Sequence, residues 1–175
     1  GRLRSQPSME NESVNGQARK NLLGQDPAAL MRRAIALAQS AREKGNHPFG
    51  ALLAAPNGTV LLEAEKTVTE DHDETSHAEL NLISAANRKL AQANRRQAIM
   101  YASTEPCAMC AGAIQHARIA RVVYGARDPK TGACGSVVDL FAEPRLNHHA
   151  RVRGGVMNED CGALLSSFFA ERRRR

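Results

Sequence analysis

The chain has 175 residues, of which 42% are hydrophobic and 24% are charged, which is enough for one domain with a buried core. Its four cysteines are too few, and two of them too close together, for a disulfide-rich secreted fold, so we expect a reducing cytoplasmic setting. Because no apolar run approaches the roughly 20 residues of a membrane-spanning helix, we expect no membrane partner.

The net charge of +6 lies at the two ends of the chain. Residues 26–170 are close to neutral, with 16 basic and 15 acidic residues, whereas Arg172 to Arg175 form an unbroken run of arginines. Such a run either contacts the phosphates of a nucleic acid or is a solvated tail. Charge alone does not decide between the two.

The N-terminal residues differ from the rest of the chain. Residues 1–25 are polar and lack apolar periodicity, so we expect a disordered segment there, followed by a single domain over residues 26–175. Asp26 and Pro27 are typical of the N-cap and first position of a helix. Apolar residues at helical spacing follow them until Gly45, which predicts the first helix of the domain.

Strand and helix patterns alternate along the remaining chain. Residues 49–55 and 59–65 predict a hairpin, and a polar loop over residues 66–76 leads to a helix that begins at His77. The other expected elements are a strand over 98–103, a helix from Cys107, a strand over 121–125, a glycine-rich loop over 125–136, a helical turn over 137–141, a strand over 152–156 and a final helix capped by Asn158. This order predicts an α/β fold, a three-layer α/β/α sandwich around a mixed sheet.

Three side chains have the composition of a metal site. His77, Cys107 and Cys110 offer one imidazole and two thiolates, and three protein ligands leave a fourth position open for water, as a catalytic zinc site needs. The two cysteines are three residues apart, so on a helix they share one face. Pro106 suits the first turn of that helix, and a helix N-terminus lowers the pKa of a thiol. The spacing therefore predicts a zinc site.

Glu79 stands two residues after His77 and is not needed as a ligand. It is free to take a proton from a zinc-activated water and deliver it to a ring nitrogen and then to a departing amine. This arrangement of histidine, glutamate and a Pro-Cys-x-x-Cys segment is typical of zinc deaminases of nucleobases.

Two other interpretations of the cysteines stay open. A Cys-x-x-Cys pair can be a redox dithiol. A structural zinc site needs a fourth protein ligand. The candidates for that ligand are His72, His116, His148, His149, Cys134 and Cys161. Cys134 and Cys161 also suit buried positions as small apolar residues.

Several segments resemble a known family. They are residues 104–114, 118–136, 146–148, 155–156 and 161–173. The first is similar to the motif of the cytidine-deaminase-like superfamily. The loop over residues 125–136 and the ending over residues 164–169 more particularly resemble the bacterial tRNA adenosine deaminases, which convert the wobble adenosine of an anticodon to inosine.

The resemblance implies the cytidine-deaminase-like fold, with a mixed five-stranded sheet. It implies one Zn2+ per subunit on His77, Cys107 and Cys110, with proton transfer by Glu79. It also implies a homodimer whose interface helps to build the active site, and the anticodon loop of tRNA as partner, contacted by the final helix. The candidate substrate contacts are Lys66, Pro106, Asn147, Phe168, Phe169, Arg172 and Arg173.

The front half of the chain departs from this family. The tRNA enzymes have an asparagine that hydrogen-bonds the base where this chain has Lys66, and an ammonium has three donors but no acceptor. Residues 45–50 and 78–83 look more like bacterial deaminases of guanine and related bases. The two halves of the chain therefore point to different substrates.

Three hypotheses follow. The leading one is zinc-dependent hydrolytic deamination of adenosine to inosine at the wobble position of tRNA. The alternative is a deaminase of a free base or nucleoside of the guanine or cytosine type. The third is a catalytically silent RNA-binding subunit, against which the presence of Glu79 argues.

Overall fold

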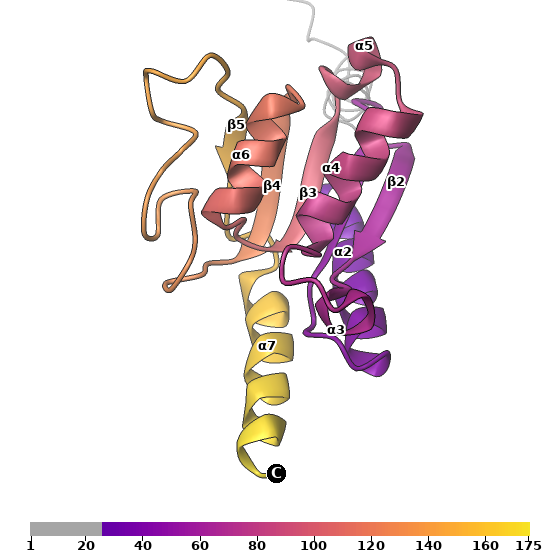
Figure 1. The fold of residues 1–175 in the computed structure, drawn as a ribbon, viewed down its shortest axis with the longest axis vertical. Coiled ribbons are helices and arrows are strands. Elements are labelled where there is room, and N and C mark those ends of the chain that lie inside the picture. The colour runs from indigo at the N-terminus through magenta and orange to yellow at the C-terminus, as the bar shows by residue number, and fades with distance from the viewer. Residues whose placement is uncertain (1–25) are drawn as a thin grey trace, which may run out of the picture.

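The computed structural model describes residues 26–175, so the expected disorder of residues 1–25 lies outside the described part of the chain. Its centre is one five-stranded sheet in the order β2-β1-β3-β4-β5 (Figure 1). The strands are β1 (Gly50–Ala54), β2 (Val60–Glu65), β3 (Ile99–Thr104), β4 (Arg121–Ala126) and β5 (Arg151–Arg153). Strand β1 is antiparallel to both of its neighbours, whereas β3, β4 and β5 are parallel. The predicted mixed sheet is thereby confirmed.

Helices cover both faces of the sheet (Figure 1). They are α2 (Pro27–Glu43), α3 (Val68–Asp71), α4 (Ala78–Lys89), α5 (Gln92–Arg95), α6 (Ala108–His116) and α7 (Asn158–Arg173). The apolar faces of α4 and α6 bury one side of the sheet, and α2 packs with the start of α7 on the other. This is the expected three-layer sandwich.

The interior strand β1 shows why the sheet needs both layers. All five of its residues are buried. Ala51 and Leu53 face the core with α4 and α6, while Leu52 and Ala54 face the core with α2. Because successive side chains of a strand point to opposite faces, a continuous apolar run requires cover on both sides.

The start of the domain follows the predicted capping pattern. The Asp26 carboxylate accepts a hydrogen bond from the backbone N–H of Ala28 at 3.1 Å, and Pro27 is the first helical residue. Within the described residues, no helix is both long and apolar enough to cross a membrane.

Two predictions about the last third of the chain are wrong. Residues 137–141 form no helical turn, because the Asp139 carboxylate accepts hydrogen bonds from the backbone N–H groups of Phe141 and Ala142 and closes a tight turn instead. The N-cap of α7 is Met157, in the left-handed region at φ 54°, and not Asn158.

Two smaller differences concern element lengths. The last strand stops at Arg153 rather than Val156, since Gly154 and Gly155 follow it and Gly155 has a φ of 82°. The predicted polar loop over residues 66–76 contains the one-turn helix α3.

Helix α2 packs closely against strand β1 at Gly50, and this contact should limit which residue can occupy that position. A Cβ added at Gly50 would lie 2.5 Å from the Ala34 carbonyl oxygen and 2.6 Å from the Ala38 nitrogen. Because both neighbours are helix backbone, we expect Gly50→Ala to lower the free energy of unfolding by about 1–3 kcal/mol or more. Urea unfolding of the zinc-loaded protein measures this.

A matched control is Gly162→Ala in α7, where an added Cβ meets nothing within 4 Å. We expect it to stabilise the protein by about 0.5–1 kcal/mol, since alanine has less conformational freedom to lose than glycine. A Gly50→Ala variant as stable as the unmodified chain would contradict this account of the α2–β1 contact.

Candidate active site and metal centre

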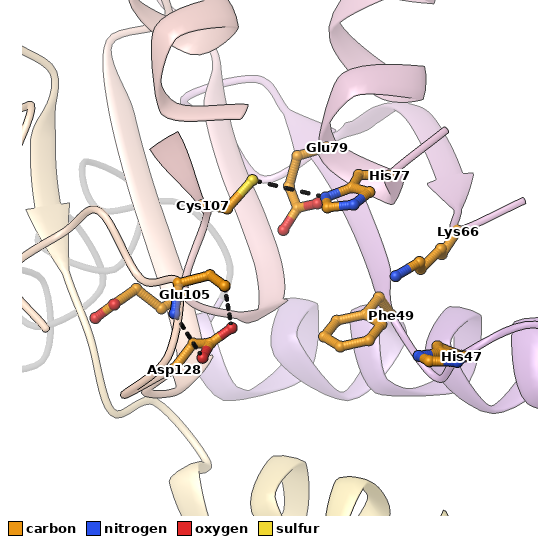
Figure 2. A pocket seen from close by; sticks show the side chains of 9 residues that line it. His47, Phe49, Lys66, His77, Glu79, Glu105, Cys107 and Asp128 are labelled. Atoms are coloured by element: carbon orange, nitrogen blue, oxygen red, sulfur yellow. Dashed lines mark hydrogen bonds between the residues drawn. The ribbon is translucent and has the colours of Figure 1, made fainter. Parts of the chain in front are cut away.

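Two helix starts place the three predicted metal ligands together. His77 is the N-cap of α4, Cys107 is the N-cap of α6, and Cys110 follows in the first turn of α6. The His77 Nδ1 atom lies 3.7 Å from the Sγ atoms of both cysteines, and all three ligand atoms lie within 4.8 Å of one another. Figure 2 shows the contact between His77 and Cys107. The sequence left open which histidine nitrogen faces the metal, and the structure assigns Nδ1.

This donor set fits zinc. A tetrahedral zinc with ordinary Zn–S and Zn–N bonds holds its sulfur and nitrogen ligands about 3.6 Å apart. The observed Nδ1–Sγ distances of 3.7 Å agree with that spacing. Among residues 26–175, the proposed fourth ligands His72, His116, His148, His149, Cys134 and Cys161 are not in the cluster. One coordination position is therefore left for water.

Electrostatics prepare one of the three ligands, Cys107, for metal binding. The hydrogen bond with Cys110 lowers the pKa of Cys107 to about 4, and His77 contributes to the same shift. The same hydrogen bond and burial raise the pKa of Cys110. The hydrogen bond with Cys107 raises the pKa of His77. The Cys107 sulfur is thus already anionic near neutral pH, as a metal ligand must be.

Glu79 lies beside the cluster without belonging to it. It occupies the first turn of α4, is only 6% exposed, and has Oε2 3.8 Å from the Cys110 Sγ. Burial raises the pKa of this carboxyl to about 7. A carboxyl with a pKa near neutrality can both accept and donate a proton at working pH.

The cluster opens into a cavity of about 210 Å³ at the carboxyl ends of β3 and β4. Its lining residues are His47, Phe49, Lys66, His77, Glu79, Glu105, Cys107, Asp128 and Thr131. Figure 2 shows Lys66, Phe49 and His47 along one side, and Glu105 and Asp128 on the other. Carboxyl ends of neighbouring strands are where α/β sheets commonly bind ligands.

The glycine-rich loop after β4 forms the wall with Asp128. The Asp128 carboxylate accepts hydrogen bonds from the backbone N–H groups of Lys130 and Thr131 and from the Thr131 hydroxyl. The buried Glu105 accepts a hydrogen bond from the Ser136 hydroxyl at 2.8 Å. A Cβ at Gly132 would collide with the Glu105 carboxylate, so this loop position needs glycine.

The end of α7 reaches the opposite rim of the cavity. Arg172 donates a hydrogen bond to the His47 Nε2 at 2.8 Å, and the His47 ring lies 5.1 Å and 5.8 Å from the rings of Phe168 and Phe169. Burial, Lys66 and Arg172 lower the pKa of His47, which therefore accepts this bond as a neutral ring. Arg173 is exposed in the last turn of the same helix.

Two predicted substrate contacts, Pro106 and Asn147, are not among the residues that line this cavity. Pro106 is fully buried, and its carbonyl accepts a hydrogen bond from the Ala133 N–H at 2.8 Å, so it holds the loop. Asn147 lines a separate cavity beside α6, where its carbonyl accepts from Arg118.

Sequence reasoning also missed several lining residues. The sequence indicates no site role for His47 and Phe49, which belong to a family-like segment, or for Asp128 and Thr131, which belong to the glycine-rich loop. All four line the cavity. The available signal was their position, because each precedes a strand or follows one in a sheet that places strand ends together.

Comparison with known proteins agrees with this geometry. Residues 25–126 match the family described as the cytidine and deoxycytidylate deaminase zinc-binding region. The chain is 41% identical over 145 residues to the tRNA-specific adenosine deaminase of Bacillus subtilis (strain 168), covering 83% of this chain and 89% of that protein.

The solved structures that superpose on this chain include deaminases as well. A tRNA:A34 deaminase, studied for A-to-I editing at the wobble position of transfer RNA, superposes with a TM-score of 0.72 at 37% identity, over 78% of this chain and 99% of that one. The guanine deaminase of Bacillus subtilis superposes with a TM-score of 0.53 at 31% identity, over 83% and 92% of the two chains. The chain therefore belongs to the zinc-binding cytidine and deoxycytidylate deaminase family, in the group that includes the tRNA-specific adenosine deaminases.

Proposed function

We propose that this protein deaminates adenosine to inosine at the wobble position of tRNA, through a single domain over residues 26–175 that acts in the cytoplasm. The observation that carries the proposal is the metal-ligand cluster of His77, Cys107 and Cys110 beside the buried Glu79. Similarity to tRNA-specific adenosine deaminases over most of the chain supports the choice of substrate.

The residue roles follow from position. His77, Cys107 and Cys110 hold one zinc ion, which supplies a hydroxide nucleophile at neutral pH when bound. Glu79 takes the proton from the attacking water and delivers it to the N1 atom of the adenine ring. It then takes the proton from the oxygen newly bonded to C6 and passes it to the amino group, which leaves as ammonia when its bond to C6 breaks. The near-neutral pKa of Glu79 serves both directions of transfer.

The basic end of α7 is proposed to contact the RNA. Arg172 and Arg173 lie in the last turn of a helix that extends beyond the sheet (Figure 1). The rings of Phe168 and Phe169 pack against His47, which lines the cavity. Guanidinium groups suit phosphates, and the bases of an anticodon loop are already unstacked and can enter a pocket.

We also propose that the protein acts as a homodimer. The exposed large apolar side chains include Met109 on α6, and Val137, Val138 and Leu146 in the segment between β4 and β5. Exposed apolar surface of this kind is typical of protein interfaces. Sedimentation velocity at micromolar concentration should give twice the mass of the chain, and a persistent monomer would contradict the proposal.

Deamination of a free base is less well supported. Lys66 in the cavity and the likeness to a guanine deaminase favour it. However, the identity to the tRNA enzymes is higher, at 41% and 37% against 31% for that guanine deaminase. A silent subunit is the least favoured, because Glu79 is present and buried in the cavity.

A side-by-side deamination assay tests the substrate. We expect zinc-loaded protein to form inosine in an anticodon stem-loop with adenosine at the wobble position, and to release no ammonia from free guanine, cytosine, adenine or their nucleosides. Deletion of residues 170–175 should lower kcat/KM for the RNA and weaken its salt dependence, since fewer phosphates are then contacted. Ammonia from a free base alone, unaffected by that deletion, would overturn the proposal.

The residue roles are tested by separating zinc content from turnover. Cys107→Ala should lose most of its zinc and unfold at a lower temperature, because metal binding is coupled to folding. Glu79→Gln should keep stoichiometric zinc but lose about 10²-fold or more in kcat, as expected when a general acid–base group is removed. Elemental analysis and single-turnover kinetics measure the two effects.

Cys161→Ala is the matched control, since Cys161 is a buried free thiol outside the cluster. It should keep both zinc and turnover. Full zinc occupancy in Cys107→Ala would refute the ligand assignment, and normal turnover in Glu79→Gln would refute the proton-transfer role.

A further inference from the structure

We infer that Lys66 selects the substrate base: its ammonium donates a hydrogen bond to a purine ring nitrogen, N3 or N7, and favours bases with an acceptor at that edge. The inference rests on the proposed function and deepens it. Lys66 follows directly after β2 and lines the same cavity as His77 and Glu79.

The side chain points along the cavity wall rather than into solvent. Its Nζ lies 4.9 Å from the centroid of the Phe49 ring, on the side of the cavity away from Glu105 and Asp128 (Figure 2). The face of an aromatic ring attracts a cation electrostatically. Phe49 therefore holds the ammonium at the wall of the cavity.

The backbone around Lys66 is fixed on both sides. The Lys66 N–H donates to the Phe49 carbonyl at 3.0 Å, and the Asn81 amide donates to the Glu65 carbonyl and the Thr67 hydroxyl, both at 2.9 Å. Asn81 lies one turn after His77 on α4, and its own N–H donates to the His77 carbonyl. These bonds tie the position of Lys66 to that of a metal ligand.

The N–H donors of the Lys66 ammonium are free to bind a ligand. Within residues 26–175, no hydrogen bond or ion pair engages the Lys66 Nζ, although the side chain is half-buried. Lys44, by contrast, donates to the Glu65 carboxylate at 3.1 Å at an exposed site. A partly desolvated ammonium without a hydrogen-bond acceptor in the protein is available to a ligand that brings its own acceptor.

The chemistry of that acceptor is restricted. An ammonium donates up to three hydrogen bonds and accepts none, so it suits ring nitrogens and carbonyl oxygens and disfavours an edge of N–H groups. Adenine offers N1, N3 and N7 as ring acceptors, and Glu79 serves N1 in the proposed reaction. The remaining acceptors are N3 and N7.

The inference is tested by a double-mutant cycle that combines a substitution of Lys66 with the replacement of one ring nitrogen of the substrate base. Wild type and Lys66→Met are compared on anticodon stem-loops that carry adenosine, 3-deazaadenosine or 7-deazaadenosine at the wobble position. On adenosine we expect Lys66→Met to lower kcat/KM roughly 10- to 100-fold, as for loss of a hydrogen bond from a charged donor. On the deaza substrate that lacks the contacted nitrogen, the same substitution should change kcat/KM by less than about 3-fold.

Two further variants complete the experiment. Lys66→Arg keeps a cationic donor and should restore much of the activity on adenosine. Lys44→Met removes a lysine outside the cavity and should leave kcat/KM unchanged on all three RNAs.

Each outcome has one meaning. Coupling between Lys66 and either deaza position supports the inference, and equal losses in Lys66→Met on all three RNAs, or no loss on any, overturn it. Inactivity of the wild type on adenosine RNA contradicts the proposed function itself, and the inference falls with it.

Discussion

The convergence of two helix N-termini on three ligand atoms is the constraint on which the site depends. The α4 and α6 helices must both start at the carboxyl end of the sheet, because His77 and Cys107 are their N-caps. The apolar faces of the same helices bury one side of the central strands. Packing of the core therefore fixes the spacing of the metal ligands, and metal binding in turn stabilises the packed helices.

Much of this arrangement could be predicted from local sequence. The Cys107–Cys110 spacing, Pro106 and the residues around His77 each act within one helix turn, so their geometry follows from the helix itself. The remaining uncertainty lay in which strand ends meet. Parallel pairing of β3 with β4 decided that, by bringing the residues that follow both strands to one edge.

Other features depend on contacts that local sequence does not encode. His47 and Arg172 are 125 positions apart, and their contact exists only because α7 passes the rim of the cavity. The helical turn predicted over residues 137–141 does not form, because the Asp139 carboxylate accepts hydrogen bonds from two backbone N–H groups. Asn147 was predicted from resemblance alone, and in this fold it lies beside α6.

Much of the cavity wall comes from residues that are not metal ligands, and this separates the reaction from the choice of base. In the proposed reaction, His77, Cys107, Cys110 and Glu79 provide hydrolysis at an amine-bearing carbon, whatever ring carries it. Lys66 and Phe49 come from the hairpin side and contact no metal ligand through a hydrogen bond, yet His47 links their wall to Arg172. One continuous surface thus joins the residue proposed to bind the base to the helix proposed to contact the RNA. On this proposal, a lysine in place of an amide changes which base edge is bound, while the reacting atoms stay where the two helix starts hold them.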